Sequence, residues 1–228
     1  MENINCCTIK SVLPLFSIGV DTLGIKPRLL YLLGGLYSSC HYKLNQVDKV
    51  METNITISQL SLLTGESPDY IKDVFYPTIK RNHQVVLNYK NYFDKVSAFR
   101  RNLFILKVPT KPFRLYHSSI FSDLLLTPEE KGYVMALYML CVRGTRRYDL
   151  SNDTIAKSLG VSLNTWKKYK CILESKGVLK RAGELDVELY DPIHSGTTIL
   201  LYPHVGTNTE CALIPECLGS EIPYNYST

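Results

Sequence analysis

The 228-residue sequence has no uninterrupted apolar stretch of the roughly 18 to 20 residues that a membrane-spanning helix requires. The short apolar segment at residues 11–20 follows Lys10, as in a signal peptide. Its single positive charge, Pro14 in its middle and the lack of a small-residue cleavage site argue against that interpretation. We therefore expect no membrane contact. The apolar segment is expected to form a short strand or arm packed against the first domain, within an N-terminal arm of residues 1–25.

Paired cysteine motifs are also missing, although the chain holds seven cysteines. None form a C-x-x-C pair, and an odd, scattered set favours a reducing compartment, so we expect a cytoplasmic protein. Cys211 and Cys217, with His194 and His204 upstream, suggest a zinc site. Zinc ligands usually come in pairs two to four residues apart, and these do not. The sequence therefore predicts no metal and no other cofactor.

Enzyme signatures are absent as well. The chain contains no G-x-x-x-x-G-K-[ST], G-x-G-x-x-G, H-E-x-x-H or G-x-S-x-G motif. Its five histidines are isolated from one another and from regularly spaced carboxylates. We expect a protein that is not an enzyme, and catalysis is the weakest of the functions considered.

Basic side chains are missing from the end of the chain. Residues 182–228 hold seven acidic side chains and no Lys or Arg, whereas residues 1–181 hold 26 basic and 14 acidic ones. The net charge of +5 is therefore the difference between a body of +12 and an end of −7. We expect residues 203–228 to form an acidic C-terminal tail that either folds back on the protein or contacts a basic surface.

Apolar residues make up 45% of the chain, enough for a folded core, and their clearest pattern lies between residues 127 and 202. The sequence Thr127-Pro128-Glu129-Glu130 combines an N-cap, a first-turn proline and a capping box, which predicts a helix. Two shorter helices follow, each with a serine cap and a glycine stop: 151–160 and 162–177. Two strands complete the pattern: 178–181 and 197–202.

This order of helix, short helix, turn, helix and hairpin resembles the winged helix-turn-helix superfamily. The resemblance is carried by LSNDTIAKSLGVSLNTWKKYKCILESKGVLKR, residues 150–181. This segment looks like the DNA-binding part of bacterial winged-helix regulators and replication initiators. It covers about 32 residues, or about 75 with the flanking helix and hairpin.

The second helix of such a motif points its N-terminal end into the major groove of DNA. In this helix, Trp166, Tyr169 and Leu173 form one apolar stripe that we expect to face the core. The other positions carry side chains suited to base edges and phosphates. The candidate DNA contacts are Leu163, Asn164, Thr165, Lys167, Lys168 and Lys170, with Lys180 and Arg181 at the base of the hairpin. The alternative is that these lysines only solvate the surface.

Shifted by 95 residues, the first half shows a faint copy of this pattern. Residues 57–68 align with 152–163, so that Gly65 matches Gly160 and Ser67 matches Ser162. An apolar helix at 27–40 precedes the copy, and strands at 85–87 and 102–108 follow it. The helix that begins at Pro68 continues toward Arg81, and Pro77 is expected to kink it or end it near Tyr76.

The charges of this first copy differ. Asp69 and Asp73 flank Lys72, which makes the N-terminal turn of the helix a poor phosphate site. More basic residues lie at its far end and in the loop predicted between the strands. The candidate DNA contacts are Lys72, Lys80, Arg81, Arg100 and Arg101. The alternative is that this half packs against a partner or a second copy of itself.

Together these patterns predict an α+β fold, mainly α, made of two tandem winged helix-turn-helix domains. The first domain covers residues 26–108 and the second 127–202. Between them, residues 109–126 form a linker, because Pro109 and Pro112 each disfavour helix at the preceding residue.

Such a tandem resembles the initiators with which plasmids and some phages mark their replication origins. The resemblance implies a sequence-specific double-stranded DNA-binding protein that acts in replication initiation or transcription regulation of a mobile element. The expected partners are duplex DNA, a second copy in a homodimer, and a replication or transcription protein at the acidic tail. Tandem winged helices also resemble chromosome-segregation adaptors, so a protein-interaction adaptor without DNA binding is the alternative.

Overall fold

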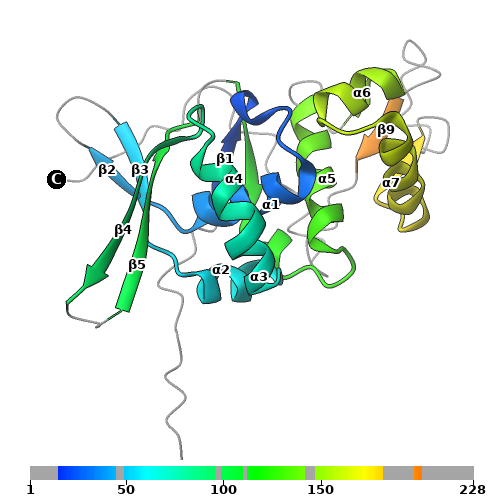
Figure 1. Cartoon of the computed structure of the whole chain (residues 1–228). Coiled ribbons are helices and arrows are strands. Elements are labelled where there is room, and N and C mark those ends of the chain that lie inside the picture. Colours follow the sequence, from blue (N-terminus) through cyan, green and yellow to red (C-terminus); the bar gives the residue numbers. More distant parts are fainter. Residues whose placement is uncertain are drawn as a thin grey trace, which may run out of the picture.

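The computed structural model describes residues 15–44, 49–95, 99–109, 112–141, 147–181 and 198–201. It has an α+β fold with more helix than strand, which confirms the predicted class (Figure 1). The strands form three small antiparallel sheets around the helices. None of the helices in these ranges has the length and apolarity that crossing a bilayer demands.

Two helices, α1 (Pro27–Ser38) and α5 (Pro128–Leu140), pack together at the centre of the fold (Figure 1). Every residue of α1 except Arg28 is buried, as expected for a helix that is apolar on all sides. Gly132 permits the close approach, because a Cβ atom at this position would lie 1.9 Å from the carbonyl oxygen of Pro27. The two halves of the sequence therefore meet through their first helices.

The first half continues after α1 with two strands, a helical region and a hairpin. Its elements are β2 (His41–Leu44), β3 (Lys49–Thr53), α2 (Ile57–Thr64), α3 (Pro68–Tyr70), η2 (Ile71–Phe75), α4 (Tyr76–Lys80), β4 (Val86–Asp94) and β5 (Phe99–Lys107). Thr56 forms a capping box with Gln59 at the start of α2. Gly65 then ends α2 in a left-handed conformation, with φ 70°, as the sequence alignment of the two halves suggests.

The sequence predicts that Pro77 either kinks the helix that begins at Pro68 or ends it near Tyr76. The helix does not end there. Instead η2 has π-helical geometry, and the helix continues through Pro77 to Lys80. Proline lacks the backbone N–H that an α-helical hydrogen bond needs, and a π turn is a common way to place such a break inside a helix. The helix is therefore distorted, not interrupted, before Pro77.

The second half follows the predicted order. Its elements after α5 are β7 (Arg147–Asp149), α6 (Asn152–Ser158), α7 (Leu163–Ser175), β8 (Leu179–Arg181) and β9 (Thr198–Leu201). Ser151 and Ser162 cap α6 and α7 as predicted, each accepting a hydrogen bond from the backbone three residues later.

The same succession of elements occurs in both halves. A helix is followed by a strand, two helical segments and two further strands. The strand order is β3-β5-β4 in the first sheet and β7-β9-β8 in the last, so the last strand lies in the middle each time. β2 is an addition at the edge of the first sheet. The faint sequence copy is thus accompanied by a repeated topology.

Parts of the segments expected to form an arm and a linker, residues 15–22 and 113–121, lie against the core. β1 (Leu15–Gly19) pairs with β6 (Phe113–His117), and the short 3-10 helices η1 (Val20–Thr22) and η3 (Ser118–Phe121) follow them. The Phe16 ring stacks on Tyr116 and Phe121. A single cluster of buried residues contains side chains of both halves, from Phe16 to Leu179. The prolines at 109 and 112 restrict only the residues before them, so they do not keep residues 113–121 out of the core.

Candidate nucleic-acid interface

The two sides of α7 differ sharply in exposure. Trp166 and Leu173 are fully buried, as predicted, and the Trp166 indole Nε1 donates a hydrogen bond to Asn152 Oδ1 at 3.0 Å. Asn164, Lys167 and Lys168 are exposed on the opposite side. This exposed stripe is the part of α7 that a ligand can reach.

Two further candidate DNA contacts on α7 are only partly exposed to a ligand. Leu163 is half-buried and packs against the hydrophobic core. Thr165 is half-buried in the N-cap, where its backbone N–H and its hydroxyl both contact the Ser162 hydroxyl, at 3.1 and 2.7 Å. We assign both residues to the structure of the helix start, since Leu163 packs against the core and the Thr165 hydroxyl already has a partner.

Lys170 lies at the edge of the stripe. Its Nζ atom is 4.0 Å from Glu174 Oε1 on the next turn of α7. This i, i+4 ion pair gives Lys170 an acidic partner on its own helix, whereas the described contact of Lys168 is with the Tyr169 ring, 5.8 Å from its Nζ atom. Lys170 is accordingly a weaker candidate for a phosphate contact.

In the first half, three candidate DNA contacts belong to the distorted helix or follow it directly. Lys72 is exposed between the exposed acids Asp69 and Asp73. Lys80 is half-buried, with its Nζ atom 3.7 Å above the centre of the Tyr89 ring, and Arg81 is exposed. The basic side chains without acidic neighbours in this helix therefore lie at its C-terminal end, as the sequence indicates.

The hairpin β4–β5 is longer than predicted. Lys90, Arg100 and Arg101 were expected in a loop but belong to paired strands. Arg101 Nε lies 2.8 Å from Asp94 Oδ2 across the strands. The strands escaped sequence detection because residues 88–94 are polar or aromatic and largely exposed, so they lack the apolar alternation of a half-buried strand. The side chain of Arg100 is outside the described part of the structure.

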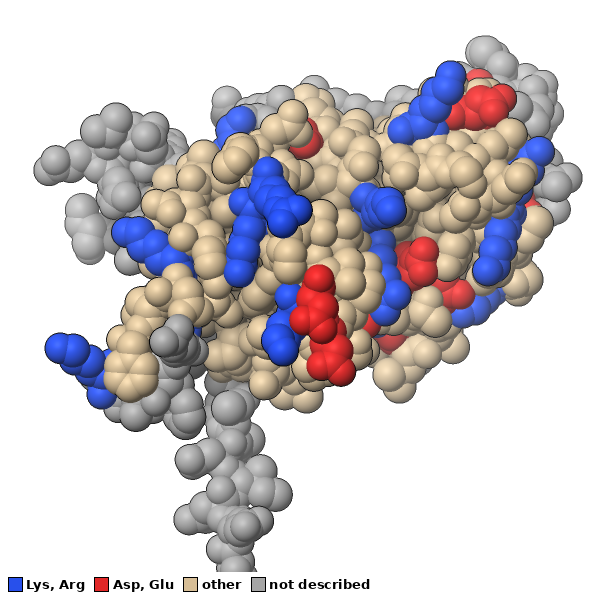
Figure 2. All heavy atoms as spheres, viewed as in Figure 1, with Lys and Arg blue, Asp and Glu red and all other residues tan. Residues whose placement is uncertain are grey.

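The candidates fall into two groups on the surface. Figure 2 shows basic side chains over α7 and, separately, over the region of α4, with acidic side chains over α3 on the same face. Lys180 and Arg181 belong to β8, but their side chains are outside the described residues. The structure thus groups the candidates by half and does not merge them into one patch.

A partly buried ion pair links α1 to the turn after α2 in the first half. Arg28 on α1 donates two hydrogen bonds to Glu66, from Nε at 2.6 Å and from Nη2 at 2.8 Å. Its guanidinium group also lies 3.7 Å above the Tyr70 ring. Burial acts to raise the pKa of Glu66, but hydrogen bonds from Arg28 and Ser67 outweigh it, and the pKa lies below its usual value.

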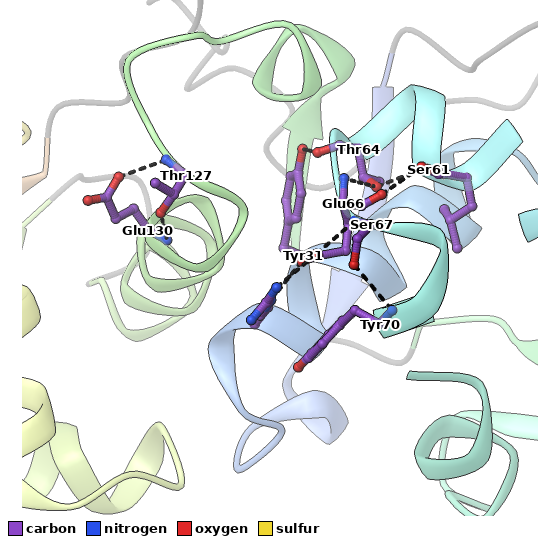
Figure 3. Close-up of polar contacts among 10 residues, drawn as sticks. Tyr31, Ser61, Thr64, Glu66, Ser67, Tyr70, Thr127 and Glu130 are labelled. Atoms are coloured by element: carbon purple, nitrogen blue, oxygen red, sulfur yellow. Dashed lines mark hydrogen bonds and ion pairs between the residues drawn. The ribbon is translucent and has the colours of Figure 1, made fainter. Parts of the chain in front are cut away.

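Tyr31 extends this connection between α1 and the turn after α2. Its hydroxyl donates to the backbone oxygen of Thr64 at 2.9 Å. Figure 3 shows Tyr31 reaching toward Thr64, with Glu66 and Ser67 beside it. No sequence motif marks Arg28, Tyr31 or Glu66. Their partners lie 33 to 38 residues away, so neighbouring residues in the sequence do not reveal these contacts.

A second connection positions α7. Glu130 closes the capping box of α5 by accepting from the Thr127 backbone at 2.7 Å, and it pairs with Lys176 Nζ at 2.7 Å. Lys176 follows directly after α7, and it also donates to the Leu125 oxygen at 2.8 Å. Burial acts to raise the pKa of Glu130, but Lys176 and Thr127 lower it below its usual value. The predicted capping residue thus also anchors the end of α7.

In the described ranges, no group of three or more His, Cys, Asp or Glu side chains is placed to hold a metal ion. The four residues considered for zinc, at positions 194, 204, 211 and 217, lie outside these ranges, as does the acidic tail. No family model, no curated protein and no solved structure matches this chain.

Proposed function

We propose that this chain is a sequence-specific double-stranded DNA-binding protein built from two tandem winged helix-turn-helix units. We place its action in replication initiation or transcription regulation of a mobile element. The repeated topology supports the fold part of the proposal, because each half has a helix, a strand, two helical segments and a hairpin. The sheet orders β3-β5-β4 and β7-β9-β8 also agree between the halves.

The observation that carries the DNA-binding proposal is the exposed stripe of α7. Asn164 offers an amide for base edges, and Lys167 and Lys168 offer charges for phosphates. Trp166 and Leu173 hold the opposite side in the core, so the stripe has a fixed orientation. Glu174 is the only acidic residue of α7, and it lies near the C-terminal end beside Lys170. A positive, rigid helix side with an amide at its N-terminal end suits the major groove.

The test is duplex binding as a function of salt. Each phosphate contact adds about 0.9 to the slope of log K against log salt concentration. The charge reversal K167E/K168E should abolish binding at about 150 mM salt, and at low salt it should reduce the slope by about 2. Fluorescence anisotropy with labelled genomic fragments measures both quantities.

Two control variants separate charge from fold. K167R/K168R keeps both charges and should bind like the parent protein. Lys157→Glu reverses one charge, half the change of K167E/K168E, at an exposed site in the last turn of α6 and should change binding little. Unchanged binding by K167E/K168E would refute the role of α7, and equal loss in Lys157→Glu would reduce it to a general charge effect.

The biological role is tested by locating the bound sites. Mapping the positions of the protein on its own genome distinguishes an origin with repeated sites from promoters. Occupancy without any preferred sequence would contradict the sequence-specific part of the proposal.

A protein-interaction adaptor is the second candidate, and one observation favours it. Leu124 and Leu125, in the loop before α5, are 96% and 67% exposed. Adjacent exposed leucines suit a protein partner better than a phosphate backbone. The absence of salt-sensitive binding to any duplex at about 50 mM salt would favour the adaptor.

A further inference from the structure

The hairpin β4–β5 carries exposed aromatic side chains on a strand that extends away from the helices (Figure 1). Phe93 is 60% exposed and Tyr92 is 39% exposed, and both lie near the far end of β4. Successive side chains of a strand point to opposite faces, so the two rings lie back to back at this end of β4 and make both faces aromatic there. The fold itself gives these two rings no reason to be aromatic, because neither belongs to the core.

The strand register shows which side of the hairpin each ring occupies. Tyr89 faces the core side, where its ring lies 5.0 Å from Phe104 and beneath Lys80. Side chains alternate along a strand, so residues 91 and 93 lie on the same side as Tyr89. The contacts agree, since the Tyr89 hydroxyl and Asn91 Nδ2 both donate to Asn102 Oδ1. A row of polar and aromatic groups therefore leads from the end of α4 to Phe93.

Two exposed lysines, Lys90 and Lys95, lie on the same strand and beside its end, so the basic side chains near Phe93 outnumber the acidic one. Residues 86–107 contain five Lys or Arg and one acid, Asp94, which pairs with Arg101 at 2.8 Å. The register places Phe93 opposite Arg100 and Tyr92 opposite Arg101. Exposed flat rings among basic residues match a ligand that combines negative charge with flat aromatic groups, which describes unstacked nucleic-acid bases.

We propose that the end of this hairpin binds DNA bases that have left the duplex stack, with Phe93 stacking on a base and the basic residues contacting phosphates. The proposal rests on the proposed function and adds that the protein prefers DNA with unpaired bases to fully paired duplex. DNA with a short unpaired region is bound more tightly than the same duplex fully paired, because the unstacking cost is then already met.

The experiment compares two DNA ligands that differ only in pairing. One is a duplex that the protein binds, and the other carries a two-nucleotide mismatch bubble placed at successive positions across it. Stacking of one base on an aromatic side chain changes affinity by about 5- to 150-fold. The parent protein should prefer the best bubble by at least about 5-fold, and Phe93→Ser should lose that preference while still binding the paired duplex.

Two variants serve as controls. Leu87→Ser removes a side chain that is 50% exposed on the same strand but distant from its end, and it should keep the preference. Phe93→Trp keeps an aromatic ring and should retain the preference. Its added indole fluorescence should be quenched by the bubble more than by the paired duplex, against the constant signal of buried Trp166.

The outcomes separate the two proposals. If the parent protein binds no DNA, the proposed function fails. If it binds duplex DNA without preferring a bubble at any position, or if Phe93→Ser keeps the preference, only the hairpin proposal is overturned. An equal loss in Leu87→Ser also overturns it, because the effect would then not come from the end of the hairpin.

Discussion

Replacing Gly132 by alanine tests the contact that joins the two halves. Alanine is favoured over glycine inside a helix by about 1 kcal/mol, so on propensity alone the substitution would stabilise the protein. The structure predicts instead that the substitution destabilises the protein. The new Cβ atom would lie 1.9 Å from the Pro27 oxygen and 2.2 Å from its carbonyl carbon. Both are backbone atoms, so α1 and α5 must move apart until the distance exceeds 3.0 Å.

Such a movement affects the most deeply buried part of the core. Overpacking of this kind typically costs about 1–3 kcal/mol, and the value here belongs at the upper end because no side chain can rotate away. Subtracting the helix-propensity gain of about 1 kcal/mol from a cost near the upper end, we expect Gly132→Ala to lower the free energy of unfolding by about 2 kcal/mol. Urea denaturation followed by circular dichroism and by the fluorescence of Trp166, the single tryptophan, measures this change.

Gly34→Ala is the matched control, since Gly34 is also buried in a helix. Its new Cβ atom would meet the terminal methyl group of Met135 at 2.8 Å, which can move aside, and the edge of Phe16 at 3.0 Å. We expect a change within about 1 kcal/mol. A Gly132→Ala protein as stable as the parent would refute the close α1–α5 contact. Unfolding in separate steps by the two signals would refute the shared core.

Two further predictions concern single groups. The pKa of Glu66 is lowered in the folded protein, so its contribution to stability is present above the unfolded value of about 4.3 and is lost as the pH falls through the folded value. Glu66→Gln should flatten the acid end of the stability profile, and an unchanged profile would contradict the Arg28 pairing. Exposed Cys171 should react with a thiol reagent in the native protein, whereas buried Cys40, whose pKa burial raises, should react only in denaturant. Bound duplex DNA should slow the Cys171 reaction, as mass spectrometry can measure; no protection would contradict contact by α7.

The parts of the fold that were predictable depend on neighbours in the sequence. Ser162 caps α7 and Trp166 faces the core because cap and stripe are set within one or two turns of helix. The cap of α5 at Thr127 was predictable for the same reason. The exposed stripe of α7 was predictable as well, because the residues that do not lie on the buried side of a helix must lie on its exposed side.

The parts that could not be predicted depend on contacts between distant segments. β1 and β6 pair across about 98 residues, and neither strand shows a turn or repeat that announces its partner. Nothing around Gly132 in the sequence indicates that Pro27 will touch it. The Arg28–Glu66 pair likewise joins groups 38 residues apart. Such contacts give the two halves a shared cluster of buried side chains, which no pattern within either half indicates.

The burial of α1 has a consequence for how this protein changes in evolution. A helix that contacts its surroundings on every side must match all of them at once, including α5 of the other half. A genetic crossover between the halves would join an α1 shaped for one α5 to a different α5. The two halves are therefore constrained to be inherited together, and substitutions in α1 and α5 should accumulate as compensating pairs.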